Sequence, residues 1–529
     1  MLDRRHFLAS MGAAVAGSLG ASAAKGFGGQ TSGQAEQPSP NPQAPGPGQA
    51  LTFTIDARRP VGAFPHYWEP IVGSGRANLA LRTDYHDDLG EVHQLAGMQS
   101  VRFHGIFDDD NGVCRLNPRG DVVYNFQYVD QIYDSLLDAG VRPFVELSFM
   151  PQALASGGKT VFSYKANVTP PKDMDAWVQL VTAFARHLFD RYGGAELSRW
   201  MFEVWNEPNL DFWAGTQDQY FDLYRRTANA LKAVDTRLRV GGPATAQVAW
   251  ASEFITYCSQ QNVPVDFFST HIYANDPQAK IFGRETDYAV EDVIPLALRR
   301  LRNQIASSPM PRLPIYISEW NSTYMNESAI TDTAYNAAFI VNTLNGCRGL
   351  VDAMSYWCFS DVFEEQGVAT NIFYGGYGLI AMRRIPKPSF HAFTLLHRLG
   401  HERLAVGQGP AMATRRPDGS VAIIVWNLSS RDKTGNPLPG SPLSLRIVIR
   451  GLGKQNKLAV THVDDAHGSA MDAYQKMGSP QYPTSEQIDA LRKAAQLPEP
   501  DHSLVAGRGY TEVPIDLPPN GIALLEFRS

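Results

Sequence analysis

The chain has 529 residues, a formal net charge of −6 and a hydrophobic fraction of 44%. This length exceeds the size at which one hydrophobic core stops growing, so at least two domains are expected. The negative charge and the lack of a long Lys/Arg run argue against nucleic acid or an anionic membrane as a partner, and favour a small neutral substrate.

The first 50 residues have the composition of export and linker segments. Arg4-Arg5 precede a short Ala/Gly-rich apolar stretch, and the small residues Ala21-Ser22-Ala23 fit a cleavage site, which indicates a twin-arginine signal peptide over residues 1–24. Residues 25–50 are rich in Gly, Pro, Gln and Ser and are expected to form a disordered linker. We therefore expect export by the twin-arginine route to the periplasm or beyond, with no membrane contact after signal cleavage.

The four cysteines are widely spaced and include no C-x-x-C pair: Cys114, Cys258, Cys347 and Cys358. Because no histidine cluster at ligand spacing accompanies them, we expect buried free thiols rather than a zinc site or a disulfide framework. We expect neither a metal nor an organic cofactor.

From about residue 51 to residue 399, short β-rich runs alternate with amphipathic helical stretches such as Asp175–Tyr192 and Thr333–Leu344. This alternation is typical of parallel strands joined by crossover helices. Eight such units, with no G-x-G-x-x-G fingerprint after the first strand, predict an α/β fold with a closed (β/α)₈ TIM barrel over residues 59–399. The eight strand candidates are Val61–Phe64, Ser100–Phe103, Arg142–Leu147, Arg199–Trp205, Leu238–Gly242, Val265–Ile272, Pro314–Ser318 and Asp352–Cys358.

Beyond Leu399 the pattern changes to alternating segments separated by Gly, Pro and Asn turns. It predicts an antiparallel β-sandwich accessory domain over residues 400–529, interrupted by a helical insertion at Ser485–Gln496. Residues 51–58 also alternate, and we expect them to add an N-terminal strand to this sandwich. The main strand candidates are Ser420–Asn427, Leu443–Ile449 and Ile522–Phe527.

Two glutamates follow apolar, aromatic-rich runs: Glu207 in RWMFEVWNEPN and Glu319 in LPIYISEWNS. Catalytic groups in a (β/α)₈ barrel come from the C-terminal ends of strands, where Glu207 would end strand four and Glu319 strand seven. Cleavage of a glycosidic bond needs one carboxyl group to protonate the leaving oxygen and another to attack or stabilise the anomeric carbon. The pair therefore predicts a glycosidase, in which Asn206 is suited to bind a sugar 2-hydroxyl.

His271 and Tyr273 are two positions apart at the end of an expected strand. Side chains at this spacing point to the same face, so both can reach the same cleft. The Tyr273 hydroxyl is then suited to steady the Glu319 carboxylate.

Further motifs stand in a fixed order along the chain: Phe64-Pro65-His66-Tyr67-Trp68-Glu69, Gly73-Ser74-Gly75-Arg76, Val101-Arg102-Phe103-His104-Gly105, Phe149-Met150-Pro151, the segment Tyr356–Glu365, and Gly375-Gly376-Tyr377-Gly378-Leu379. Together with the two glutamates, they resemble glycoside hydrolase family 39, the family of β-xylosidases and α-L-iduronidase. The resemblance covers the chain from about residue 51 onward, and the bacterial β-xylosidases are the nearest type.

The resemblance implies a retaining exo-β-1,4-xylosidase with Glu207 as the acid/base and Glu319 as the nucleophile. It also implies a group of sugar-contacting residues, among which the Trp357 ring would pack on pyranose C–H surfaces. We expect the substrate-binding residues to be His66, Asn206, His271, Tyr273, Trp357 and Glu364.

We therefore expect an enzyme that releases terminal xylose from xylo-oligosaccharides through a covalent glycosyl-enzyme. Residues 361–382, after strand eight, contain no Lys or Arg to hold a uronate, and Glu364 and Glu365 there suit the hydroxyls of a neutral pentose. The alternatives are an α-L-arabinosidase, an α-L-iduronidase, or a non-catalytic carbohydrate-binding barrel protein, the last disfavoured by two intact carboxylates.

Overall fold

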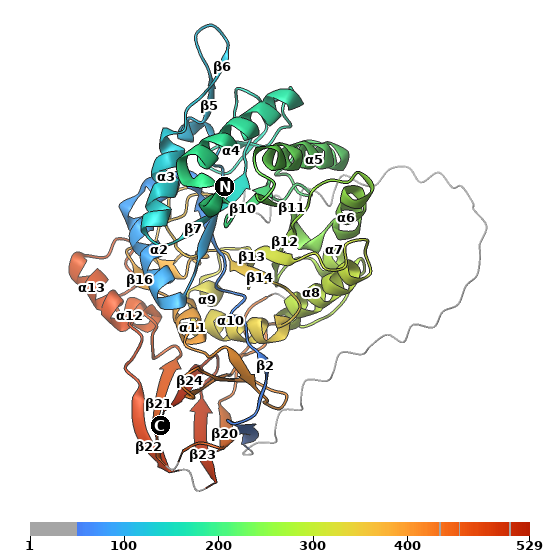
Figure 1. The fold of residues 1–529 in the computed structure, drawn as a ribbon. Coiled ribbons are helices and arrows are strands. Elements are labelled where there is room, and N and C mark those ends of the chain that lie inside the picture. Colours follow the sequence, from blue (N-terminus) through green and yellow to red (C-terminus); the bar gives the residue numbers. More distant parts are fainter. Residues whose placement is uncertain (1–49, 433–434, 454, 507–508, 529) are drawn as a thin grey trace.

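A computed structural model of the protein describes residues 50–432, 435–453, 455–506 and 509–528 (Figure 1). The expected signal peptide and nearly all of the expected linker lie outside these residues. The described chain forms a closed parallel barrel surrounded by helices, and two further sheets that enclose a separate core. The predicted TIM barrel with a C-terminal β-sandwich is confirmed.

Eight parallel strands close the barrel in chain order, each paired with the next and the last with the first. They are β3 (Val72–Arg76), β4 (Ser100–His104), β7 (Arg142–Leu147), β10 (Met201–Val204), β11 (Arg239–Thr245), β12 (Phe267–Tyr273), β13 (Ile315–Asn321) and β14 (Ala353–Tyr356). The helices of the barrel are α2 (Thr83–Ala96), α3 (Gln127–Asp138), α4 (Met174–Leu197), α5 (Gln217–Val234), α6 (Ala251–Gln260), α7 (Gln278–Phe282), α8 (Val290–Ala306), α9 (Ser328–Thr331), α10 (Ala334–Cys347) and α11 (Pro388–His397).

The first strand of the barrel differs from the sequence prediction. The segment expected there, Val61–Phe64, overlaps β2 (Pro60–Ala63), which pairs with β17 (Glu402–Leu404) in the sandwich. The barrel strand is β3, which is rich in glycine and therefore lacks a strand signature. Its glycines have a packing reason, because a Cβ at Gly73 would lie 2.6 Å from the Trp357 ring.

Local sequence sets the starts of the helices that flank strand β10. Helix α4 follows Asp173, whose side chain accepts a hydrogen bond from the Asp175 backbone N–H at 2.8 Å. Helix α5 follows Thr216, which forms a capping box with Gln219. Caps of this kind each contribute about 1 kcal/mol to helix stability.

The sandwich consists of a seven-stranded sheet and a three-stranded sheet. In the smaller sheet, β1 (Leu51–Asp56) pairs in parallel with β20 (Leu443–Arg450), and β23 (Tyr510–Leu517) completes it. Buried and exposed residues alternate along β20 and β23, as expected for strands with one face on a core. The larger sheet runs β2, β17, β18 (Ala411–Arg415), β19 (Val421–Trp426), β24 (Ile522–Arg528), β21 (Gln455–Val463) and β22 (Asp501–Ala506).

Short helices and hairpins are attached to the barrel and the sandwich. Two helices rather than one interrupt the sandwich between β21 and β22, namely α12 (Met471–Lys476) and α13 (Ser485–Ala494). Three small hairpins extend from the barrel loops, and the first of them projects furthest in Figure 1. They are β5 (Cys114–Leu116) with β6 (Val122–Tyr124), β8 (Thr160–Val161) with β9 (Ala166–Asn167), and β15 (Ile380–Ala381) with β16 (Ile385–Pro386).

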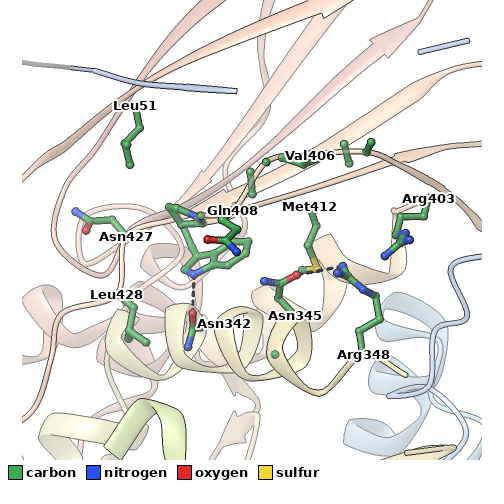
Figure 2. A pocket seen from close by; sticks show the side chains of 18 of the residues that line it. Leu51, Asn342, Asn345, Arg348, Arg403, Val406, Gln408, Met412, Asn427 and Leu428 are labelled. Atoms are coloured by element: carbon green, nitrogen blue, oxygen red, sulfur yellow. Dashed lines mark hydrogen bonds between the residues drawn. The ribbon is translucent and has the colours of Figure 1, made fainter. Parts of the chain in front are cut away.

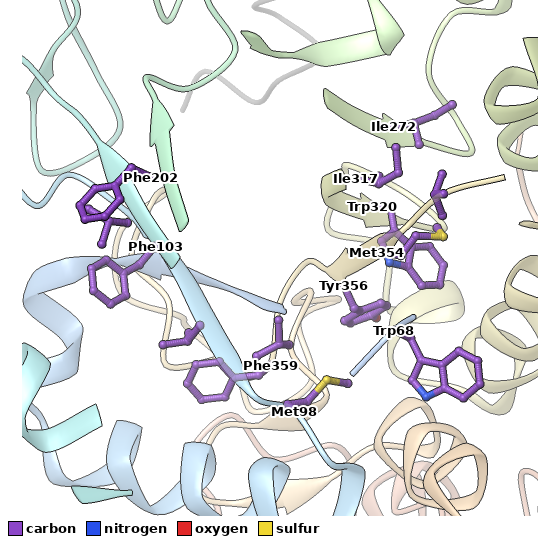
Figure 3. Close-up of a cluster of buried hydrophobic side chains, with 14 of the residues drawn as sticks. Trp68, Met98, Phe103, Phe202, Ile272, Ile317, Trp320, Met354, Tyr356 and Phe359 are labelled. Atoms are coloured by element: carbon purple, nitrogen blue, oxygen red, sulfur yellow. The ribbon is translucent and has the colours of Figure 1, made fainter. Parts of the chain in front are cut away.

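The largest hydrophobic core lies between the barrel strands and the helices around them. Figure 3 shows part of it, where Phe103, Phe202, Ile317 and Met354 come from four different barrel strands. All four cysteines are buried and free, as expected. Among the described residues, no helix is both long and apolar enough to cross a membrane.

Candidate active site

The turn after β10 holds Glu207 at the C-terminal end of the barrel. Trp205 and Glu207 have positive φ angles of 73° and 42°, which non-glycine residues adopt only when their surroundings enforce it. The Glu207 backbone N–H donates to the Ala244 carbonyl at 2.8 Å, and the Trp205 indole N–H donates to the Phe212 carbonyl at 2.7 Å. These bonds to neighbouring segments fix the direction of the Glu207 side chain.

Glu319 lies in β13 directly opposite His271 of β12. Its Oε1 accepts a hydrogen bond from Arg102 Nη1 at 2.8 Å, and its Oε2 accepts one from the Tyr273 hydroxyl at 2.8 Å. With both oxygens engaged, the carboxylate has one orientation.

His271 joins the two glutamates. Its Nδ1 lies 3.1 Å from Glu207 Oε1 and 3.5 Å from Glu319 Oε2. One carboxylate oxygen of each glutamate and one ring nitrogen of His271 all lie within 4.8 Å of one another. Glu207 and Glu319 are 2% and 3% exposed, so both carboxyl groups are almost completely buried.

A buried arginine that we did not predict pairs with several carboxylates of this site. Arg102 in β4 pairs with Glu203 at 2.6 Å and with Glu146 at 2.7 Å, in addition to Glu319. Burial by itself would lower the pKa of Arg102, but the three carboxylates outweigh it and raise that pKa above its ordinary value. The guanidinium is therefore a permanent cation that connects four barrel strands.

Arg102 also orients Asn206. Its Nη2 donates to Asn206 Oδ1 at 3.0 Å, which leaves the amide nitrogen of Asn206 as the group available to donate elsewhere. A sequence signal for this network existed, since Arg102, Glu146 and Glu203 each have apolar residues directly on both sides within a strand segment. A charge in such a place points into a polar interior.

His104 at the end of β4 is a second cation of the site. Its Nδ1 donates to Glu146 at 2.8 Å, and its Nε2 lies 3.4 Å from Glu365 Oε1 and 3.7 Å from Glu319 Oε1. Burial alone would lower the pKa of His104, but these carboxylates, Glu146 foremost, raise it to about 10. The imidazole is thus charged at neutral pH.

Aromatic side chains line the pocket beside His104. The Trp357 ring, directly after β14, lies 4.8 Å from the His104 ring and packs with Tyr273, Phe363 and other aromatic residues. The space for this ring comes from Gly73 on the neighbouring strand β3. The packing therefore holds the Trp357 ring in place beside His104.

The structure brings Asn206, Glu207, His271, Tyr273, Glu319 and Trp357 together, but it places two other candidates elsewhere. His66 precedes β3 at the opposite end of the barrel, where its Nδ1 contacts Glu69 at 2.6 Å and its ring lies 4.4 Å from that of His401. An aromatic, histidine-containing motif can pack under a barrel as well as over it. The expectation of sugar contact for His66 is corrected on this ground.

Glu364 is the second candidate that the structure places apart from the two glutamates. Its carboxylate points to Arg76 and Arg82, at 3.6 and 3.2 Å, whereas the adjacent Glu365 faces His104 in the pocket. Adjacent residues in a loop point in different directions, and the sequence alone does not tell which one faces inward.

A large pocket of about 910 Å³ lies away from this site, between the sandwich and α10 (Figure 2). Trp426 donates to Asn342 on its floor, at 3.2 Å, and Arg348 and Arg403 lie at one end. None of the candidate site residues lines it. The carboxylate pair, and not this pocket, therefore identifies the candidate active site.

Comparison with known proteins agrees with this geometry. A family profile described as Glycosyl hydrolases family 39 matches residues 51–508. The chain is 40% identical over 475 residues to a β-xylosidase of Geobacillus stearothermophilus, covering 88% of this chain and 93% of that protein, and 39% identical over 461 residues to one of Caldicellulosiruptor saccharolyticus, covering 84% and 92%. A crystal structure of a monomeric β-xylosidase from Caulobacter crescentus CB15 matches with a TM-score of 0.84 and 35% identity, over 90% of this chain and 99% of that one.

Proposed function

The chain belongs to glycosyl hydrolase family 39 and is a glycoside hydrolase, and on this premise we propose that it is a retaining, exo-acting β-xylosidase that releases terminal xylose from xylo-oligosaccharides. The observation that carries the proposal is the approach of the Glu207 and Glu319 carboxylate oxygens to within 4.8 Å. Retaining glycosidases hold their carboxyl groups about 5 Å apart, whereas inverting ones need roughly 6.5–9.5 Å to admit a water molecule.

In the first step, a Glu319 oxygen attacks the anomeric carbon and forms a covalent bond to it. The bond from that carbon to the leaving oxygen breaks, and Glu207 transfers its proton to this oxygen. Arg102 and Tyr273 hold the attacking carboxylate, while the Asn206 amide donates to the sugar 2-hydroxyl, a contact that strengthens in the transition state.

In the second step, the Glu207 carboxylate accepts a proton from a water molecule whose oxygen attacks the same carbon. The bond to Glu319 breaks, xylose leaves, and both glutamates return to their initial protonation states. Because each displacement inverts the anomeric carbon, two of them give net retention. His271, which contacts both carboxylates, is suited to respond as the proton moves on and off Glu207.

The contacts between two loops next to the site support exo action. Glu207 must face the leaving group, so the glycone lies on the other side of Glu319, towards His104, Glu365 and Trp357. On that side the loop after β7 meets the loop after β14, where the Ser163 N–H donates to the Glu365 carbonyl at 2.8 Å. We infer that loops joined there leave room for one terminal sugar and not for a second.

The names of the relatives and the charges in the pocket support xylose as the sugar. The cations of the site, Arg102 and His104, are already paired with carboxylates, so neither is left over to neutralise a uronate. Glu365 faces the glycone and would repel such an anion, whereas it accepts hydrogen bonds from the hydroxyls of a neutral pentose. Lys280 and Arg284, the nearest basic candidates by sequence, are exposed side chains.

Two measurements test the proposal. A panel of nitrophenyl glycosides should show efficient turnover of the β-D-xyloside and little or none of an α-L-iduronide, and equal turnover of both would refute the choice of sugar. Proton NMR of the first product from the β-xyloside should show β-xylose before mutarotation. First-formed α-xylose would refute the nucleophilic role of Glu319.

A further inference from the structure

We propose that Arg76 is a specificity-determining residue: it clamps three loops into the wall behind the glycone and thereby restricts the enzyme to single terminal sugars. The inference rests on the proposed exo action and deepens it. Arg76 is the last residue of β3, and its side chain is only 12% exposed. Its backbone belongs to the barrel, but its guanidinium contacts three segments that come from other strands.

The three contacts use different features of the guanidinium. Nη1 pairs with Asp110 Oδ2 at 2.8 Å, in the loop after β4, and Nε lies 3.6 Å from Glu364 Oε2, in the loop after β14. The face of the group lies over the Tyr164 ring, 4.6 Å from its centroid, in the hairpin after β7. A planar cation can stack on a ring and pair with carboxylates around its edge at once, which a lysine ammonium cannot reproduce.

A second set of contacts shows that these loops form one wall. Ser163, next to Tyr164, donates its N–H to the Glu365 carbonyl at 2.8 Å and its hydroxyl to the Glu364 carbonyl. The hairpin β8–β9 is therefore attached to the loop after β14 by two hydrogen bonds from Ser163, next to Tyr164. The strands that carry the two loops, β7 and β14, are not neighbours, because β3 and β4 lie between them. The attachment thus crosses the mouth of the barrel.

The wall stands directly behind the residues that face the sugar. Phe162, in the same hairpin, is stacked on the His104 ring with a centroid distance of 5.9 Å, and Glu365 Oε1 lies 3.4 Å from His104 Nε2. A second sugar attached to the glycone at its non-reducing side would have to pass through this wall. Loosening the clamp should therefore create room for it.

The test is the first product of nitrophenyl β-xylobioside, a substrate with two possible cleavage positions. The wild-type enzyme should release xylose and nitrophenyl β-xyloside first, with free nitrophenol only after a lag. Arg76→Met, which keeps the bulk of the side chain and removes its charge and plane, should release xylobiose and nitrophenol from the start. We expect the ratio of xylobiose to xylose in the initial products to rise at least about tenfold, since the lost cation–π contact and charge pair are partly buried.

Three further variants make the test specific. Arg82→Met is the matched control and should leave the product ratio unchanged. Arg82 also pairs with Glu364, but it is more exposed than Arg76. In the described part of the chain, only Arg76 of the two lies over the Tyr164 ring. Arg76→Lys should resemble Arg76→Met, since charge alone does not restore the stacked fork. If Arg76→Met fails to fold, Tyr164→Leu, which removes the stacking surface, should raise the same ratio.

The outcomes separate the inference from the proposed function. If the wild-type enzyme does not hydrolyse nitrophenyl β-xyloside, the proposed function is refuted, and the clamp is tested with the mono- and disaccharide of the sugar that the enzyme does cleave. If the wild-type enzyme hydrolyses the xyloside, but folded Arg76→Met and Tyr164→Leu release no more disaccharide than the wild-type enzyme, the clamp is refuted and the xylosidase proposal stands.

Discussion

Tyr273 and Glu319 lie on adjacent barrel strands, and the Tyr273 hydroxyl donates a hydrogen bond of 2.8 Å to Glu319 Oε2. The register of the two strands pairs His271 with Glu319, so Tyr273, two residues further on, projects from the same face toward the carboxylate. Arg102 holds the other oxygen from β4, which is three strands away from β13 around the barrel. The orientation of the proposed nucleophile thus depends on one residue of the adjacent strand and on one residue of a strand that is not adjacent.

Replacing Tyr273 by phenylalanine should lower kcat/KM for nitrophenyl β-xyloside about 10- to 100-fold. A hydrogen bond to a charged group contributes about 1.5–3 kcal/mol, and without it the carboxylate loses one of its two donors. Tyr377→Phe is the control, because its hydroxyl donates to the Tyr324 backbone carbonyl in the same aromatic cluster. Equal losses in the two variants would show that the effect comes from disturbing the aromatic cluster and not from the hydrogen bond between Tyr273 and Glu319.

The two glutamates should respond differently to removal. Glu319→Ala should have no detectable turnover of nitrophenyl β-xyloside, and added azide should restore it with formation of an α-xylosyl azide, since a small anion can take the place of the lost nucleophile. An azide product of β configuration would assign the nucleophilic role to another residue.

Glu207→Ala should keep much of its activity on nitrophenyl β-xyloside and lose about 10²- to 10⁴-fold on xylobiose. The reason is that nitrophenolate is stable enough to leave without a proton, whereas the leaving oxygen of xylobiose must receive a proton. Comparison of kcat/KM for the two substrates checks this expectation, because kcat/KM reports the first step, whereas the second step needs Glu207 as a base with either substrate. Losses of the same size on both would count against Glu207 as the acid.

Glu365 and Glu364 form a matched pair for the sugar-binding role. Glu365 faces His104 in the pocket, whereas Glu364 points to Arg76 and Arg82. We expect Glu365→Gln to lower kcat/KM for nitrophenyl β-xyloside about 10- to 100-fold, because a charge-assisted contact to the sugar is lost, and Glu364→Gln to have a much smaller effect. The reverse order would restore Glu364 as the substrate-binding residue.

His104 should make the fold sensitive to alkaline pH. Its pKa is raised to about 10 in the folded protein, against about 6.5 in an unfolded chain, so the protonated form stabilises the fold. This contribution is complete below about pH 6.5 and is lost as the pH rises through about 10. Urea unfolding should therefore show a free-energy difference between wild type and His104→Gln that shrinks over this range.

His502→Gln, at an exposed position of β22, is the control for that measurement and should leave the pH profile unaltered. A constant difference between wild type and His104→Gln from pH 6.5 to pH 10 would mean that the charge of His104 does not contribute to stability.

Much of the architecture was readable in the sequence because it depends on local patterns. Helical spacing identified α4 and α10, and alternation identified β19, β20 and β24, each within a few residues of its observed bounds. The Gly-rich strand β3 escaped, since glycine gives no strand signal and its role there is to leave space for Trp357. A local sequence pattern cannot identify a glycine that is needed because a residue distant in the sequence packs against it.

The sequence by itself determined which strand ends carry the two glutamates, because strand length and polarity are properties of neighbouring residues. Only the tertiary structure decided that Arg102 joins four strands, that His66 lies under the barrel, and that Glu365 rather than Glu364 faces the pocket. The physical reason is that these contacts depend on barrel closure, strand register and loop direction, which bring together residues up to hundreds of positions apart.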